Sequence, residues 1–386
     1  MSRLPARSAV VAMAVLGLVG CRAKEAPPAA SQTEWTDPAA HTSGFVTVNG
    51  VRLNYLDWGG TGPTLILIHG YGDNPHAFDD LAPAFTDRFH VIGYARRGHG
   101  RSEAKGPYDV ATLTEDLRQL MDSLGIAKAD LAGWSMGGDE VTAMAGTHPD
   151  RVGKIVYLDA GYDWADSANV IAFDSIPADL TPPPSAMTSY PSYRASHLAT
   201  WFPALDDPGR VEAYIRDLVD VQPDGSVRPA MDDSAGAALY HTLLTDHREY
   251  GKVKAPALAI YAETFFDTVH GDSTQRVKNL AWERKFFAPF REGSIARIRK
   301  ELPQVEVVRV PGTHADFLFV SRDRVVAAMR RFLADSAGPT RLPSPATLGR
   351  SGPPRAAARS SVPGSRPAPA PRRAPRAAAG AHRRGA

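Results

Sequence analysis

A serine in a glycine-framed turn is the residue of this chain best placed to do chemistry. Gly133-Trp134-Ser135-Met136-Gly137 follows a short apolar run, and an apolar, helix-like run over residues 140–148 follows it. A strand, a sharp turn and a helix in this order hold a serine hydroxyl clear of the sheet. The residues that flank such a turn must be small, because a β-carbon there would clash with the strand or the helix. The pattern therefore predicts Ser135 as a nucleophile.

A serine hydroxyl attacks a carbonyl only with help from its neighbours. A histidine can take its proton near neutral pH, and a carboxylate behind the histidine fixes the tautomer of the ring. His314 follows Gly312 and Thr313, just past the apolar run 305–310, which we predict to be the last strand. Sites on open parallel sheets lie at the carboxyl ends of the strands, so this position favours His314 as the base.

Apolar runs that alternate with helical patterns predict the elements that position these groups. Further strands are expected over residues 64–72, with a glycine-rich exit, and over residues 89–95, 154–159 and 257–262. Apolar residues at helical spacing predict a helix over residues 109–124, ended by Gly125. Strands that alternate with helices indicate an α/β fold, with a mostly parallel central sheet and helices on both faces.

The order of these motifs resembles the α/β-hydrolase superfamily over roughly residues 45–335. The matching pieces are His69-Gly70, the stretch Arg97-Gly98-His99-Gly100-Arg101-Ser102, residues 133–138, and Gly312-Thr313-His314. The resemblance implies Ser135 as nucleophile, His314 as general base, and an oxyanion hole built from the backbone N–H groups of Tyr71 and Met136. We expect structural hydrogen bonds rather than catalysis from His69 and His99.

The acid of the triad stays open among several carboxylates. The superfamily usually places it a few residues beyond the penultimate strand, near Phe265, where no aspartate stands. Glu263 comes early and Asp267 late. A variant of the superfamily uses the end of the strand after the serine's helix, where Asp159 lies. Asp159 is our choice, and Glu263, Asp267 and Asp163 are the alternatives.

Residues 1–21 have the pattern of a targeting signal. Arg3 and Arg7 precede an apolar run over residues 9–20, which is too short to span a bilayer as a helix. It ends at Leu18-Val19-Gly20-Cys21, which resembles a bacterial lipobox. We therefore expect an exported protein of the bacterial cell envelope, lipid-anchored to a membrane through Cys21, with residues 22–42 as a flexible tether. The alternative is an ordinary secretory signal in which Cys21 is incidental.

Residues 337–386 hold ten arginines, ten prolines and no acidic residue, and this composition predicts a disordered tail. Without those arginines, 34 basic residues face 42 acidic ones, so the rest of the chain is acidic, with a net charge of −8. We expect a passive tail, the alternative being attachment to an anionic envelope component. No metal-ligand spacing, phosphate loop or repeat stands out, and we expect no nucleic-acid partner.

The hydrolase domain is expected over residues 43–336, and in the superfamily the interval after the strand 154–159 houses a lid. We place an inserted helical lid over about residues 160–250. Aromatic residues and prolines over residues 182–203 suit an apolar acyl pocket, or they pack the lid onto the core. Residues 210–221 predict an amphipathic helix, and residues 267–302 a second helical insert.

These observations together predict a serine hydrolase that acts on a small-molecule ester through Ser135, His314 and Asp159, without a cofactor. Amidase or aminopeptidase, lactonase and cofactor-free perhydrolase activity on the same residues are the alternatives within this chemistry. A non-catalytic envelope binding protein is the alternative outside it. The sequence leaves the oligomeric state open.

Overall fold

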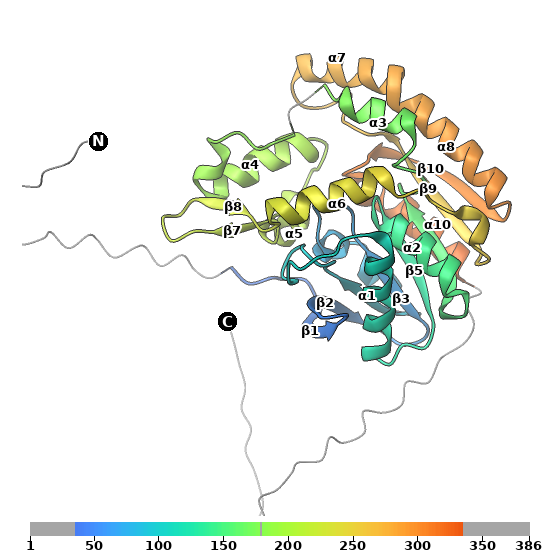
Figure 1. Ribbon diagram of the computed structural model, residues 1–386. Coiled ribbons are helices and arrows are strands. Elements are labelled where there is room, and N and C mark those ends of the chain that lie inside the picture. Colours follow the sequence, from blue (N-terminus) through green and yellow to red (C-terminus); the bar gives the residue numbers. More distant parts are fainter. Residues whose placement is uncertain (1–34, 178–179, 335–386) are drawn as a thin grey trace, which may run out of the picture. The chain divides into compact units, whose positions relative to one another are not determined.

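A computed structural model describes residues 35–177 and 180–334. These residues form an eight-stranded sheet in the order β1-β2-β4-β3-β5-β6-β9-β10, parallel from β4 to β10 and antiparallel at β1 and β2 (Figure 1). The strands are β1 (Thr42–Val48), β2 (Val51–Gly59), β3 (Thr64–Ile68), β4 (His90–Tyr94), β5 (Ala129–Trp134), β6 (Val152–Leu158), β9 (Ala257–Thr264) and β10 (Val305–Thr313). The predicted α/β architecture is confirmed.

Side chains of the central strands alternate between two hydrophobic clusters, one on each face of the sheet. On β3, Ile66 and Ile68 join one cluster while Leu65 and Leu67 join the other. The helices divide in the same way. The first cluster includes residues of α1 (Val110–Ser123), α2 (Gly137–Thr147) and α8 (Ala288–Glu301). The second includes residues of α9 (Phe317–Val320), α10 (Arg322–Leu333) and the 3₁₀ turns η1 (Pro75–Phe78) and η2 (Ala82–Phe85).

Helix α1 shows how local sequence sets the bounds of an element. Its N-terminal cap is Asp109, whose side chain accepts a hydrogen bond from the backbone N–H of Thr112 at 2.9 Å. The helix ends before Gly125, which has a φ of +70°. Leu113, Leu117 and Leu120 bury one face. The prediction of a helix over residues 109–124 is confirmed.

The segment between β6 and β9 forms the lid, and it is not wholly helical. Its helices are α3 (Ser167–Asp174), α4 (Tyr190–Trp201), α5 (Glu212–Arg216) and α6 (Asp233–Thr245), with 3₁₀ turns η4 (Ala186–Thr188), η5 (Pro208–Val211) and η6 (Tyr250–Lys252). Strands β7 (Val219–Val221) and β8 (Val227–Pro229) form a small hairpin between α5 and α6.

The prediction of one amphipathic helix over residues 210–221 is therefore wrong. Helix α5 covers five residues, and the chain then enters β7. Two β-branched residues, Val221 and Val227, face each other across the hairpin, and Gly225 takes the positive φ of the turn (+86°). The cross-strand pairing outweighs the helical spacing of the apolar residues.

The second insert is helical, as predicted. It consists of α7 (Ser273–Trp282), a π-helical segment η7 (Glu283–Phe287) and α8. A further 3₁₀ turn, η3 (Pro149–Arg151), leads into β6.

No helix among the described residues is both long and apolar enough to cross a membrane. The predicted signal with Cys21 and the predicted tail over residues 337–386 lie outside the described residues.

The last part of the segment predicted as a tether packs on the fold. Asp37 lies 3.4 Å from the ring of His76, and His41 lies 3.6 Å from Asp79. Strand β1 begins directly afterwards, at Thr42. Side-chain contacts with η1 thus begin before residue 43, the boundary that the sequence indicated.

Candidate active site

Ser135 occupies the turn between β5 and α2, with a φ of +53°. A β-carbon on Gly133 would collide with the carbonyl oxygen of Gly137, and one on Gly137 would collide with that of Ile68. A β-carbon on Gly70 would lie 3.0 Å from the β-carbon of Ser135. The turn is therefore as tight as the sequence pattern requires, and the loop after β3 passes directly beside the serine.

His314 connects Ser135 to Asp159. Its Nε2 lies 2.9 Å from the Ser135 hydroxyl, and its Nδ1 lies 2.6 Å from a carboxylate oxygen of Asp159. Two hydrogen bonds of the His314 backbone hold the loop after β10. Its N–H donates to the carbonyl oxygen of Thr264 at 2.9 Å, and its carbonyl oxygen accepts from the indole N–H of Trp134 at 3.1 Å. The structure brings together the three side chains that the sequence analysis chose, in the geometry of a nucleophile, a base and an orienting acid.

Asp159 sits at the end of β6, in the left-handed backbone region with a φ of +45°. One carboxylate oxygen contacts His314, and the other accepts hydrogen bonds from the hydroxyl of Tyr162 at 2.8 Å and the backbone N–H of Ala262 at 3.1 Å. The backbone N–H of Asp159 donates to Ile260 at 2.7 Å. This buried carboxylate is thus held in one orientation from two sides.

The other candidate acids are engaged elsewhere or point to solvent. Glu263 is exposed on β9. Asp267 accepts from the backbone N–H groups of Val269 and His270, and its second oxygen contacts the His270 ring at 3.0 Å. Asp163 pairs with Arg297 and with His247. Of the four candidates, Asp159 is the one hydrogen bonded to His314.

Two residues that the sequence analysis did not single out complete this arrangement. The ring of Phe265 stacks on the imidazole of His314, with centroids 4.6 Å apart and an interplanar angle of 11°. Phe265 stands where the superfamily pattern would have placed the acid. Tyr162, three residues after Asp159, supplies the hydroxyl donor described above. The hydrophobic character of Phe265 gave no signal of this role.

A buried arginine fixes the loop that passes beside Ser135. Arg96 donates to the carbonyl oxygens of His69 at 2.8 Å and Gly70 at 3.1 Å, and it pairs with Glu140 of α2. Tyr94 donates to the other oxygen of Glu140 at 2.7 Å. This network ties the exits of β3 and β4 to the helix that follows the serine.

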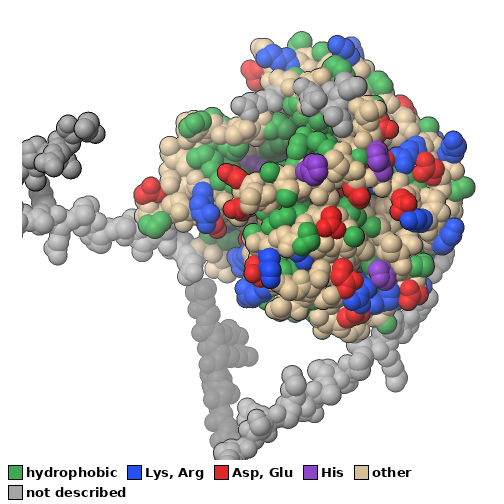
Figure 2. Space-filling view, viewed as in Figure 1, with side chains coloured by type: hydrophobic (Ala, Val, Ile, Leu, Met, Phe, Trp, Pro, Cys, Tyr) green, Lys and Arg blue, Asp and Glu red, His purple; other side chains and the backbone are tan. Residues whose placement is uncertain are grey.

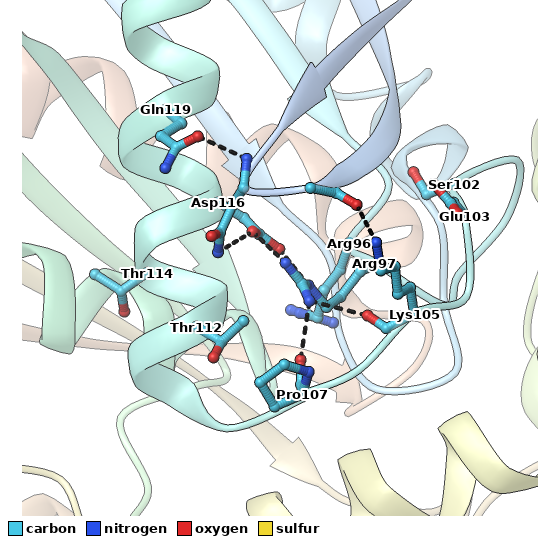
Figure 3. A network of polar contacts seen from close by, with 12 residues as sticks. Arg96, Arg97, Ser102, Glu103, Lys105, Pro107, Thr112, Thr114, Asp116 and Gln119 are labelled. Atoms are coloured by element: carbon cyan, nitrogen blue, oxygen red, sulfur yellow. Dashed lines mark hydrogen bonds and ion pairs between the residues drawn. The ribbon is translucent and has the colours of Figure 1, made fainter.

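A second network holds the loop after β4 (Figure 3). Both Nε and Nη2 of Arg97 donate to the carboxylate of Asp116 on α1 at 2.6 Å, and Nη1 donates to the carbonyl oxygens of Lys105 and Pro107. Asn49 adds a further donor to Asp116 at 2.9 Å. The first helix of the fold is thereby linked to the loop that carries His99.

His69 and His99 make structural hydrogen bonds, as predicted. The ring Nε2 of His69 accepts from the backbone N–H of Arg96 at 3.0 Å, and that of His99 accepts from Gly72 at 3.1 Å. Burial and the charge of Arg96 lower the pKa of His99 to about 3. Burial also lowers the pKa of His69 well below its usual range, so both rings are neutral acceptors that position backbone near Tyr71.

The two amides expected to form an oxyanion hole are available as donors. No hydrogen bond between described residues uses the backbone N–H of Tyr71 or of Met136. Tyr71 lines the same cavity as Ser135, and Met136 follows the serine directly. The Tyr71 hydroxyl is occupied in another way, donating to the carbonyl of Gly236 at 3.1 Å.

A cavity of about 460 Å³ opens over Ser135 and His314. Lid residues form most of its wall, and Figure 2 shows hydrophobic side chains around a hollow on the side where α3, α4 and α6 lie in Figure 1. The apolar and aromatic lining comprises Trp134, Trp164, Phe173, Ile176, Leu180, Pro182, Tyr193, Trp201, Tyr214, Leu218, Pro229, Met231, Tyr240, Leu243 and Phe265. Such a wall suits an apolar group of modest size.

Asp73 is the carboxylate in this wall, and the sequence analysis missed it. It accepts a hydrogen bond from the hydroxyl of Tyr214 at 2.6 Å. Removal from bulk water raises the pKa of Asp73 to about 6, against the lowering effects of the Tyr214 hydrogen bond and the charges of His314 and Arg96. The sequence signal that could have identified Asp73 was its position, two residues after Tyr71 in the glycine-rich loop that follows β3.

The comparisons with known proteins agree with this fold. Residues 63–183 match the family model described as alpha/beta hydrolase fold. Among solved structures, E-2-(acetamidomethylene)succinate hydrolase superposes with a TM-score of 0.62 at 22% identity, covering 76% of this chain and 99% of its own. The enol-lactonase of Burkholderia xenovorans superposes with a TM-score of 0.50 at 24% identity, covering 75% and 100%. The chain has the α/β-hydrolase fold.

Curated relatives match over shorter stretches. A Caulobacter segnis protein named carbamate hydrolase RutD is 35% identical over 116 residues, which are 29% of this chain and 43% of the relative. The pimeloyl-[acyl-carrier protein] methyl ester esterase of Neisseria meningitidis is 27% identical over 202 residues, 50% of this chain and 72% of the relative. The chain spans less than half the length of the first relatives it matches. Relatives named as hydrolases support the predicted enzyme class, an α/β-hydrolase, and their individual substrates do not transfer with it.

Proposed function

We propose that the protein is a serine hydrolase that cleaves carboxylic esters with an apolar acyl group. The observation that carries the proposal is the position of His314, within hydrogen-bond distance of both Ser135 and Asp159 beneath a mostly apolar cavity. Relatives named as an ester hydrolase and a carbamate hydrolase support carbonyl chemistry of this kind.

In the proposed reaction, the Ser135 oxygen attacks the ester carbonyl while Nε2 of His314 takes the hydroxyl proton. The Met136 and Tyr71 amides stabilise the negative charge on the carbonyl oxygen. The C–O bond breaks, the leaving alcohol receives the proton from His314, and the acyl group stays on Ser135. Water then attacks the acyl-enzyme with the same proton transfers and releases the acid. Asp159 keeps the imidazole in the required tautomer throughout.

Two features support an apolar acyl group. The cavity has a volume within the range of small-molecule sites, and aromatic rings from the lid form much of its wall. Phe265 and Trp164 also shield the His314 ring, at centroid distances of 4.6 and 5.8 Å. Both arrangements place apolar side chains around the reacting groups, and such surroundings strengthen the electrostatic interactions among those groups.

We further propose that the protein is exported and attached to a membrane through Cys21. The support is the sequence of residues 1–21 alone: the two arginines, the apolar run and the lipobox-like Leu18-Val19-Gly20-Cys21. Expression of the full chain in a bacterium tests this. Wild type should enter the membrane fraction and Cys21→Ala should leave it, whereas equal distribution of the two would contradict lipid attachment.

The decisive experiment on the chemistry combines turnover with labelling. p-Nitrophenyl esters of increasing acyl length are assayed with wild type and Ser135→Ala, and a fluorophosphonate probe is mapped by mass spectrometry. We expect turnover in wild type, a probe adduct on Ser135, and a loss of about 10⁶-fold in kcat for Ser135→Ala. A Ser135 adduct without ester turnover would redirect the proposal to amides or lactones. The absence of an adduct on folded wild type would refute acyl-enzyme chemistry.

A further inference from the structure

Four metal-binding side chains converge at the edge of the fold, and none of them lines the cavity over Ser135. Asp37 and His41 come from the segment before β1, His76 lies in η1, and Asp79 follows that turn directly. One ligand atom from each of the four lies within 4.8 Å of the others. Two imidazole nitrogens and two carboxylate oxygens form a donor set that zinc accepts.

The spacing of these atoms fits tetrahedral coordination. His41 Nε2 lies 3.0 Å from Asp37 and 3.6 Å from Asp79, and His76 Nδ1 lies 2.8 Å from Asp79 and 3.4 Å from Asp37. Zinc bonds to nitrogen and oxygen of about 2.0–2.2 Å place neighbouring tetrahedral ligands about 3.3 to 3.6 Å apart. The contacts within the cluster scatter around the lower end of this range.

Two hydrogen bonds, between His41 and Asp37 at 3.0 Å and between His76 and Asp79 at 2.8 Å, account for only part of the arrangement. Each of the two imidazole nitrogens carries at most one proton, which can point to a single carboxylate oxygen. Each nitrogen nevertheless faces both carboxylates, and the two negative charges converge on one spot. A divalent cation between them would satisfy all four ligand atoms and neutralise both carboxylates.

A histidine–carboxylate pair elsewhere in the protein shows the contrast. The ring of His90 lies 3.0 Å from both oxygens of Asp57, as a simple hydrogen bond or ion pair requires. This pair belongs to none of the potential metal-binding groups found among the described residues. The cluster differs from the His90–Asp57 pair because a second histidine and a second carboxylate converge on the same point.

The surroundings of the cluster also suit a bound ion. The side chains of His41, His76 and Asp79 are 7%, 8% and 10% exposed. The indole Nε1 of Trp58 donates to Asp79 at 3.0 Å, a supporting hydrogen bond of the kind that orients ligating carboxylates. A surface cavity lined in part by Asp37, His41 and His76 provides a path of entry.

We propose that Asp37, His41, His76 and Asp79 form a structural zinc site that fastens the segment before β1 to the body of the fold. Four protein ligands complete a tetrahedral shell and leave no position for a substrate, so the proposed role is structural. Because Asp37 and His41 precede the sheet in sequence, the ion would fix the path by which the chain enters the fold. The proposal is independent of the proposed ester hydrolysis.

The test measures zinc binding by the full chain, produced without a histidine tag and freed of metal by a chelator. Titration calorimetry with Zn²⁺ and elemental analysis after dialysis should give one zinc per chain in wild type. His76→Gln and Asp79→Asn should retain none, because loss of a direct ligand should exceed the roughly 10–100-fold cost of losing an outer-shell partner. Zinc should also raise the Tm of wild type by several degrees and leave that of both variants unchanged.

His90→Gln is the matched control, since it removes a histidine paired with a carboxylate outside the cluster, and it should still bind one zinc. If His76→Gln fails to fold, His41→Gln gives the same test in the segment before the sheet. Co²⁺ in place of zinc should give the intense visible absorption of tetrahedral coordination in wild type and in His90→Gln. The cluster variants should not show this absorption. Failure of wild type to retain zinc, or unchanged binding by the cluster variants, would overturn the proposal.

Discussion

The loops around Ser135 and the wall of the cavity above it are held by different interactions. Beside the serine, buried charges and directed hydrogen bonds join the loop after β4 to two helices: Arg96 to Glu140 of α2, and Arg97 to Asp116 of α1. The wall instead consists mainly of aromatic and aliphatic lid residues that touch through ring and van der Waals contacts. Hydrogen bonds in the first region fix the positions of the loops around Ser135, whereas the apolar contacts of the second region determine the shape of the cavity.

This difference indicates what each region contributes. Attack on a carbonyl depends on distances of about 3 Å, so the polar region should tolerate little change. Apolar walls tolerate changes that preserve volume and respond mainly in which substrate they accept. Substitutions in the polar region should therefore reduce kcat or stability, and substitutions in the wall should redistribute preference among substrates.

The largest effect is expected at the carboxylate of the proposed triad. Asp159→Asn keeps the size of the side chain but offers an amide to His314, which favours the wrong tautomer of the imidazole. We expect kcat on the best p-nitrophenyl ester to fall by about 10⁴-fold, as in the corresponding change in serine proteases, with little change in KM. Glu263→Gln is the control and should retain wild-type kcat. An equal fall in both variants would contradict the assignment of Asp159.

The next effect concerns the buried ion pair that holds the loop beside Ser135. In Arg96→Met, Glu140 loses its cation while both side chains are at most 1% exposed. Breaking such a pair should lower the free energy of unfolding by about 3–5 kcal/mol, measured by urea denaturation. Arg309→Met removes the cation of the exposed pair with Glu292 and should cost no more than about 1 kcal/mol.

A double variant guards this test against simple loss of folding. Arg96→Met combined with Glu140→Leu removes both charges and should recover much of the stability, because no uncompensated carboxylate remains buried. Equal losses in the free energy of unfolding for Arg96→Met and Arg309→Met would show that the buried network beside the serine stabilises the protein no more than an exposed ion pair does.

The same division explains which parts of the protein the sequence could predict. The turn at Ser135, the strands and α1 follow from local signals: glycines, apolar runs and a capping aspartate. Asp159 was chosen among four candidates because a variant of the superfamily uses that strand end, and only its contact with His314 in the structure separates it from the other three. Asp73 and Phe265 depend on partners far away in sequence, Tyr214 and His314, and the histidine–aspartate cluster likewise combines two separate segments. No local spacing marks such contacts.

A smaller effect is expected when the cavity wall is changed. Met231→Ala shortens a lining side chain and enlarges the cavity. We expect kcat/KM to shift by about 10-fold between short and long acyl chains, the size of effect that one methylene or two produce in an apolar pocket. Val277→Ala, on α7 and 69% exposed, is the control and should leave the chain-length profile unchanged. A uniform loss over all chain lengths would assign Met231 a role in the polar region instead.

The smallest effect, a few-fold, is expected from Asp73, which lies in the loop after β3 and also lines the cavity. Because burial raises the pKa of its carboxyl to about 6, Asp73 is neutral below that pH and negatively charged above it. The charged form favours a substrate that carries an ammonium group, so the ratio of kcat/KM for an ammonium-bearing ester to that for its neutral isostere should rise as the pH increases through 6. The ratio cancels pH effects that act equally on both substrates. In Asp73→Asn the ratio should stay flat between pH 5 and pH 7. A step that persists in this variant would show that another group sets the charge preference of the cavity.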